Sequence, residues 1–94
     1  MTSLRETVVC ADGFRMSVQA SQYHYCSPRT DDAEVYTSVE IGFPTTCDSS
    51  LAPYMSADGD VAGWVPANIV HTIIELHGGM VSGELPPLPK EKAD

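Results

Sequence analysis

The chain has 94 residues, of which 43% are hydrophobic and 19% are charged. This composition is typical of one folded domain and excludes intrinsic disorder over most of the length. Thirteen Asp and Glu residues against five Lys and Arg residues give a formal net charge of −8. Because an acidic body repels phosphate groups, direct nucleic-acid binding and adsorption to an anionic membrane are disfavoured.

Two paired strands are predicted within the first 20 residues. Residues 6–10 form a short β-type run, and the Asp12-Gly13 turn that follows is a strong hairpin signal because glycine accepts a positive φ. After the turn, every second residue is apolar, namely Phe14, Met16, Val18 and Ala20. The pattern therefore predicts a hairpin with one buried face.

A long loop is predicted for residues 21–33, which show no sustained period. Long irregular segments in small domains are often functional. Tyr and Arg side chains are enriched at interface hot spots, so this region is the candidate binding surface. Its candidate residues, with one from the following strand, are Tyr23, His24, Tyr25, Arg29, Asp31, Asp32 and Tyr36. The alternative is that the tyrosines only pack the loop onto the sheet.

The longest predicted strand covers residues 35–43. Its apolar or β-branched side is expected to face the core, and it consists of Val35, Thr37, Val39, Ile41 and Phe43. The opposite, polar side is expected to carry Tyr36, Ser38 and Glu40. Pro44 lacks a backbone donor and should end the strand.

The second half of the chain is predicted to contain one main helix. Residues 45–55 favour a short helix that carries Leu51, Tyr54 and Met55, residues 56–63 have the composition of a turn, and residues 64–65 are extended. Pro66 suits a helix start, and Gly78-Gly79 suits a helix stop. Between them an apolar stripe repeats at offsets of three and four, namely Ile69, Val70, Ile73, Ile74 and His77.

Met80 and Val81 favour a last short strand that ends at Gly83. Residues 84–94 are rich in proline and charge, and we expect them to form an extended or disordered tail outside a domain of residues 1–83. Together these elements predict an α+β fold: a small antiparallel sheet of three to four strands with one main C-terminal helix packed on one face.

Catalytic and metal-binding motifs are not apparent. His24, Cys26, Cys47 and His77 lack the close ligand pairs of a zinc site. His71 and Glu75 are expected to form only an exposed helix pair. A nucleophilic pair of Cys26 with His71 has no support from spacing. Glu34 and Glu40 lie too far apart on one strand for paired acid–base catalysis. Asp58-Gly59-Asp60 lacks the later ligands of a calcium loop. We therefore expect no enzyme activity, no metal and no cofactor.

The cellular context follows from the cysteines and the hydropathy. Cys10, Cys26 and Cys47 are odd in number and irregularly spaced, which favours reduced thiols. No apolar run approaches the roughly 20 residues that span a bilayer, and the first residues do not have the pattern of a signal peptide. A cytoplasmic protein is the expectation.

Five short segments suggest a family resemblance: Asp-Gly-Phe-Arg-Met-Ser-Val-Gln-Ala-Ser (12–21), Tyr-Cys-Ser-Pro-Arg (25–29), Val-Glu-Ile-Gly-Phe-Pro (39–44), Trp-Val-Pro (64–66) and His-Gly-Gly (77–79). Together they resemble short accessory proteins encoded by tailed bacteriophages. The resemblance implies action in the host bacterial cytoplasm, by stoichiometric binding that inhibits a host protein. A component of antiviral defence such as a CRISPR–Cas complex is the expected target. The resemblance supplies no catalytic residues.

Two other functional classes remain open. One is an oligomer that sequesters a small ligand or nucleotide with Arg29 and the tyrosines, and the other is a virion or assembly component. An exposed sheet edge would also allow homodimerisation in any of these cases.

Overall fold

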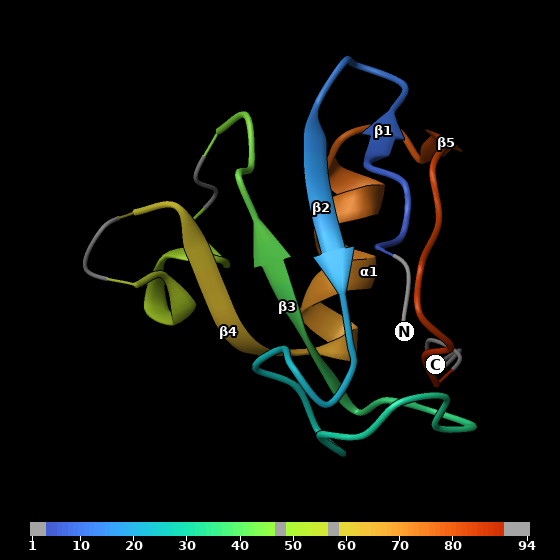
Figure 1. Ribbon diagram of the computed structural model, residues 1–94. Coiled ribbons are helices and arrows are strands. Elements are labelled where there is room, and N and C mark those ends of the chain that lie inside the picture. The colour runs from blue at the N-terminus through green and yellow to red at the C-terminus, as the bar shows by residue number, and fades with distance from the viewer. Residues whose placement is uncertain (1–3, 47–48, 57–58, 90–94) are drawn as a thin grey trace.

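Alternating apolar residues in the first two thirds of the chain produce an antiparallel meander, which one helix covers from behind (Figure 1). The computed structural model describes residues 4–46, 49–56 and 59–89. Over this part of the chain the strands are β1 (Val8–Cys10), β2 (Arg15–Gln19), β3 (Ser38–Gly42), β4 (Val61–Pro66) and β5 (Met80–Ser82). The helices are the 3₁₀ turn η1 (Ala52–Tyr54) and α1 (Ala67–Leu76).

The strands form one five-stranded sheet in the order β4-β3-β2-β1-β5, and every neighbouring pair is antiparallel. β4 and β5 lie at opposite edges, so α1 crosses the back of the whole sheet to connect them (Figure 1). The predicted α+β class and the predicted hairpin are confirmed. The sheet has five strands and not the predicted three to four. Residues 61–63, which have the composition of a turn, join residues 64–65 in a full strand, β4, which pairs with β3.

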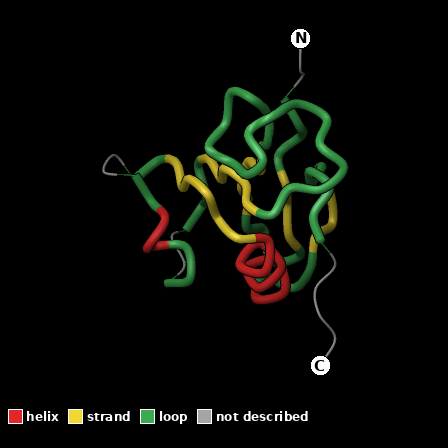
Figure 2. The backbone as a smooth tube through the Cα atoms, turned by 90° about the horizontal axis from the view of Figure 1, so that it is seen from below, coloured by secondary structure: helices red, strands yellow, loops and turns green. Residues whose placement is uncertain are grey.

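The core lies between the sheet and α1. Val70 and Ile73 of the helix are fully buried together with Val39 and Ile41 of β3. The predicted inward residues of the hairpin are buried too, which confirms that side of the pattern: Phe14, Met16, Val18 and Ala20. Viewed from below, α1 lies on one side of the strands and most of the irregular chain of residues 21–36 lies on the other (Figure 2).

Both ends of the predicted 35–43 strand depart from the expected alternation. Regular β-structure begins only at Ser38, and Val35 is 41% exposed. Tyr36, predicted to lie on the polar side, is completely buried, and its hydroxyl donates to the Thr30 carbonyl at 2.7 Å. Phe43, predicted to be buried, is 72% exposed, since its φ of 51° turns the chain away from the strand.

The helix has the predicted ends. Pro66 is the N-cap residue, and the Ala67 N–H donates to the Thr37 carbonyl at 3.0 Å, which satisfies one of the unpaired donors of the first turn. Gly78 and Gly79 have φ values of 89° and 96°, as the predicted stop requires. The expected pair of His71 with Glu75 is not the contact observed, because His71 Nε2 lies 3.0 Å from the Pro89 carbonyl.

Residues 84–89 pack against the domain instead of leaving it. Leu85 and Leu88 contact the core, and Pro86 is buried. The Tyr36 N–H donates to the Pro87 carbonyl at 2.8 Å, which joins this segment to the start of β3. The expectation that the tail would bury no apolar surface is therefore wrong for residues 84–89, and residues 90–94 lie outside the described chain.

The segment before β4 is shorter and tighter than the helix predicted for residues 45–55. Among the described residues of this range, 45–46 and 49–55, only Ala52–Tyr54 forms a 3₁₀ turn. Leu51 is fully buried, and Tyr54 and Met55 pack on the core as the prediction required. Among the residues that the structure describes, no helix has the length and apolar character needed to cross a membrane.

Candidate functional site

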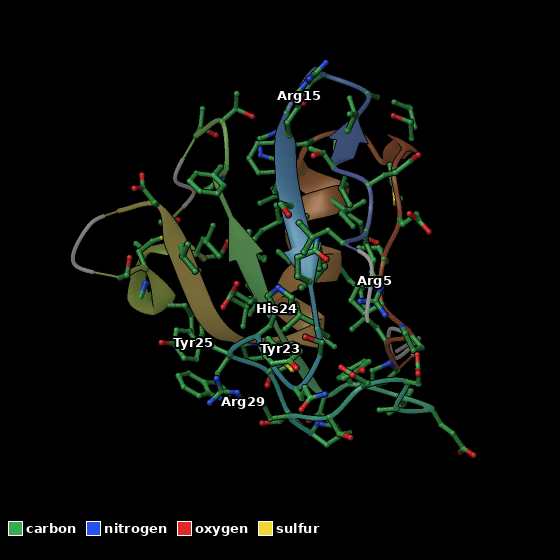
Figure 3. The ribbon with its side chains drawn as sticks, viewed as in Figure 1. Arg5, Arg15, Tyr23, His24, Tyr25 and Arg29 are labelled. Atoms are coloured by element: carbon green, nitrogen blue, oxygen red, sulfur yellow. The ribbon has the colours of Figure 1, made fainter. Side chains whose placement is uncertain are left out.

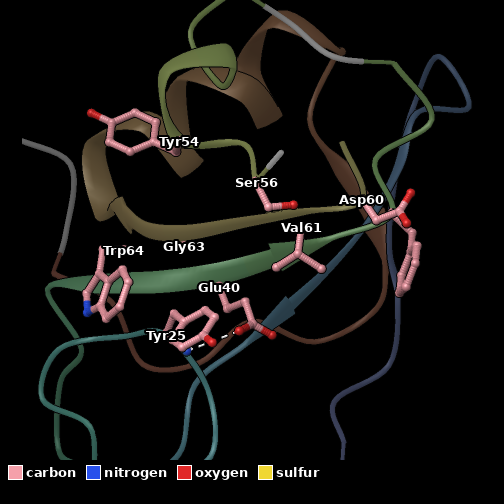
Figure 4. A pocket seen from close by; sticks show the side chains of 9 residues that line it. Tyr25, Glu40, Tyr54, Ser56, Asp60, Val61, Gly63 and Trp64 are labelled. Carbon is pink, nitrogen blue, oxygen red and sulfur yellow. Dashed lines mark hydrogen bonds between the residues drawn. The ribbon is translucent and has the colours of Figure 1, made fainter. Parts of the chain in front are cut away.

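The face of the sheet opposite α1 is covered only in part. On its β1–β2 side the N-terminal segment supplies the cover, where Gln19 exchanges two 2.9 Å hydrogen bonds with the backbone of Arg5 and the Arg5 guanidinium donates to the Ala20 carbonyl. On its β3–β4 side the surface is hollowed into a groove of about 590 Å³ (Figure 4). The groove is lined by Tyr25, Glu40, Phe43, Tyr54, Ser56, Asp60, Val61, Gly63 and Trp64.

A β-bulge shapes the floor of the groove. Val39 pairs with Val65 and Ile41 with Ala62, so one β3 residue, Glu40, faces two β4 residues. Trp64 is one of these two, and its φ of 49° lies in the left-handed region, which is costly for a bulky residue. Bulges with such conformations re-aim side chains beside binding sites. Here the bulge leaves the Trp64 side chain half exposed on an otherwise paired strand.

Tyr25 and Trp64 form one end of the groove, and Arg29, which does not line it, extends their stack. The Tyr25 and Trp64 rings lie 4.8 Å apart, centroid to centroid, at an interplanar angle of 25°. The Arg29 guanidinium carbon lies 5.3 Å from the Tyr25 ring centroid, within the range of a cation–π contact. Gly63 makes room for this arrangement, because a Cβ there would lie 3.1 Å from the Tyr25 Cβ.

Two hydrogen bonds donated by backbone N–H groups fix the stack to the sheet. The Trp64 N–H donates to the Tyr25 carbonyl at 2.9 Å, and the Tyr25 N–H donates to Glu40 Oε2 at 3.1 Å (Figure 4). Glu40 therefore has a structural role and still presents a carboxylate to the groove. The stack is held in place before any ligand arrives, which reduces the entropy cost of binding.

Phe43 and Asp60 form the other end of the groove. The Phe43 N–H donates to the Asp60 carbonyl at 2.7 Å, so the two residues are held side by side. Phe43 is the second exposed aromatic residue of the groove with a positive φ. Backbone conformations of this kind concentrate at binding sites, and two of them lie on this groove.

The groove carries negative charge and aromatic surface. Glu40 and Asp60 are its two carboxylates, and no Lys or Arg side chain lines it within the described ranges 4–46, 49–56 and 59–89. The four aromatic rings are Tyr25, Phe43, Tyr54 and Trp64. This combination suits a ligand that brings both apolar surface and positive charge.

The structure brings together some of the predicted site residues and separates others. Tyr25 and Arg29 come together in the stack, and Figure 3 shows them with Tyr23 and His24 at the same end of the sheet, opposite Arg15. Tyr23 is exposed but does not line the groove.

The other predicted residues have internal contacts or different locations. His24 Nδ1 lies 2.7 Å from the Ser21 hydroxyl, and the Asp31 carboxylate accepts two hydrogen bonds from Gln22, so both residues brace the loop. Asp32 is exposed with a φ of 55°. Tyr36 is buried in the core and offers no surface to a partner.

The sequence prediction missed Phe43, Asp60 and Trp64 as groove residues. Phe43 continues the period of its strand, and only its backbone conformation exposes it. Trp64 is the single tryptophan of the chain and stands beside a glycine and before Val65-Pro66, which signals an irregular strand without revealing which side the ring takes.

A second, smaller hollow of about 250 Å³ lies beside the β1–β2 turn. His77 Nδ1 lies 2.6 Å from the Asp12 carboxylate, and the His77 ring stacks on Phe14 with centroids 4.0 Å apart. A hydrogen bond from the Phe14 N–H, and then one from His77, lower the pKa of Asp12. These contacts join the turn to the end of α1, so we assign the pair a structural role.

Cys10 and Cys26 are buried free thiols, and burial raises the pKa of each. Cys47 lies outside the described residues. Within the described chain no three His, Cys, Asp or Glu side chains gather as a metal site would require.

Comparisons of the chain with protein-family models, with curated proteins and with solved structures found no significant match.

Proposed function

We propose that the protein acts by binding another protein stoichiometrically through the groove on β3 and β4. The observation that carries this proposal is the pre-formed Arg29–Tyr25–Trp64 stack on a strained bulge. Aromatic anchors that are already ordered in the free protein are typical of interface hot spots.

Charge complementarity supports a basic partner surface. The chain carries a formal charge of −8, and the groove adds Glu40 and Asp60 beside the aromatic rings. An acidic groove attracts a basic partner and speeds its association, whereas it repels an acidic partner. The resemblance to phage accessory proteins supports the narrower proposal that the partner is a host protein in the bacterial cytoplasm, such as a component of antiviral defence, and that binding inhibits it.

Affinity capture from bacterial lysate tests this proposal. We compare the wild-type protein with the Phe43→Gly, Trp64→Gly double variant, because glycine suits the positive φ at both positions and removes both rings. Leu76→Ala is the matched control, since Leu76 is an exposed apolar residue on α1, on the opposite side of the sheet.

We expect a near-stoichiometric partner with the wild-type protein and with Leu76→Ala, weakened by high salt and lost with the double variant. Tyr23→Ala should retain the partner, whereas Tyr25→Ala with Arg29→Ala should lose most of it. Capture that survives the loss of both rings would refute the groove as the binding surface. A protein that elutes alone at every salt concentration would favour ligand capture or self-assembly.

A further inference from the structure

We infer that the groove recognises an arginine side chain within an extended segment of the partner protein. This inference rests on the proposed function and specifies the chemistry of the contact. Its first support is the charge of the groove, since Glu40 and Asp60 lack a Lys or Arg partner among the described residues. A cationic group on Trp64 would meet the Glu40 carboxylate without displacing an ion pair of the described residues, and Asp60 would add to the negative field of the groove.

The second support is an internal example of the same contact. Arg29 already places its guanidinium 5.3 Å from the centroid of the Tyr25 ring. Trp64 stacks on Tyr25 and is 50% exposed, so an indole surface is left open in the same assembly. Trp presents the most favourable ring for a cation, and a second guanidinium there would repeat chemistry that the molecule already uses.

The choice of arginine over lysine follows from shape. A guanidinium is planar, stacks on aromatic rings and donates two parallel hydrogen bonds to one carboxylate, whereas an ammonium is a compact, strongly hydrated charge. A half-exposed ring beside a carboxylate fits the planar group better. The Glu40 carboxylate can accept from such a group, because the Tyr25 N–H donates to Oε2 alone and each carboxylate oxygen has two lone pairs.

The shape of the groove favours an extended segment. One aromatic end of the groove is formed by Trp64 and the other by Phe43, which lies beside Asp60. Asp60 directly precedes β4, and Trp64 is four residues further along the chain. Four steps at roughly 3.3 Å per residue span about 13 Å, which matches about four residues of extended chain. The arginine would then lie on Trp64 beside Glu40, and an apolar side chain of the same segment would lie on Phe43.

Peptide binding tests the inference directly, with Trp64 as the only tryptophan reporter. We titrate capped Ser-Leu-Arg-Leu-Ser into the protein and follow its fluorescence, together with matched peptides in which lysine or citrulline replaces arginine. Citrulline keeps the shape of arginine and removes its charge. Glu40→Gln and Asp60→Asn remove the groove charges while retaining acceptor oxygens, and Glu75→Gln on α1 is the charge-matched control outside the groove. Circular dichroism checks that each variant is folded.

We expect the arginine peptide to bind at least about tenfold more tightly than the citrulline peptide, and more tightly than the lysine peptide. The preference should fall in Glu40→Gln and Asp60→Asn and persist in Glu75→Gln. Equal binding of arginine and citrulline, a lysine preference, an unchanged preference in the groove variants, or no binding of any peptide would overturn the inference. Partner capture that still depends on Phe43 and Trp64 would leave the proposed function standing in each of those cases.

Discussion

Single backbone conformations decide which aromatic residues are available for binding. Phe43 follows the period-two pattern that places Val39 and Ile41 in the core, but its positive φ turns the ring to solvent. Tyr36 shows the reverse, since the chain before Ser38 leaves the regular strand and buries a ring that alternation assigns to the surface. Periodicity reports residue types and not φ values, so these two positions could not be predicted.

The conformation of Phe43 predicts an unusual stability series. Since Phe43 is 72% exposed, replacing it removes little packing, and the left-handed conformation then dominates the effect. We expect Phe43→Gly to be more stable than Phe43→Ala by about 1 kcal/mol, because only glycine adopts this φ without a steric penalty. Urea unfolding of the two variants measures the difference. An alanine variant as stable as the glycine variant would show that the backbone at this position is not strained.

The Asp12–His77 pair predicts a pH effect on stability. Hydrogen bonds from Phe14 and His77 lower the pKa of Asp12 below its ordinary value of 3.8. A group whose pKa is lower in the folded state contributes stability above its unfolded pKa and loses that contribution as the pH falls through the folded value. The difference in melting temperature between the wild-type protein and Asp12→Asn should therefore shrink as the pH falls from about 4 to 2. A difference in melting temperature that stays constant over this pH range would show that the ionised Asp12 carboxylate does not stabilise the fold.

At the level of elements, local sequence signals were sufficient to predict strands that pair with their chain neighbours and the ends of the helix. The Asp12-Gly13 turn and the flanking alternation predict the β1–β2 hairpin, and Pro66 with Gly78-Gly79 predicts both ends of α1. The site depends on features that lack such signals. The bulge at Trp64 arises from pairing between β3 and β4 across an 18-residue connection, and the docking of residues 84–89 depends on contacts with Tyr36 and His71.

The apolar stripe of α1 gives the prediction at this scale. Ile73 is fully buried between the helix and the sheet, so Ile73→Asp would place an unpaired charge in the core. We expect this variant to lose its cooperative thermal transition, whereas Glu75→Gln, on the exposed side of the same helix, should melt like the wild-type protein. A cooperative melt of Ile73→Asp near the wild-type temperature would mean that the helix does not anchor the core.

At the scale of the whole molecule, the core and the proposed binding groove lie on opposite faces of the sheet. The back of the sheet and α1 form the apolar core, while the opposite face carries the N-terminal cover on one side and the acidic, aromatic groove on the other. The sequence predicted the helix-covered face and the acidic charge, and it named Tyr25 and Arg29 as candidate binding residues. It could not locate the groove on β3 and β4, because three of the groove residues come from segments that look like core or turn.

The most direct test of the groove uses its single tryptophan. Protein labelled with 5-fluorotryptophan should give one ¹⁹F NMR resonance, which reports on Trp64 alone. We expect this resonance to shift or broaden when the captured partner is added at a stoichiometric amount, because the partner covers a ring that is half exposed in the free protein. A resonance that stays unchanged while the complex forms would place the interface elsewhere and contradict the central claim.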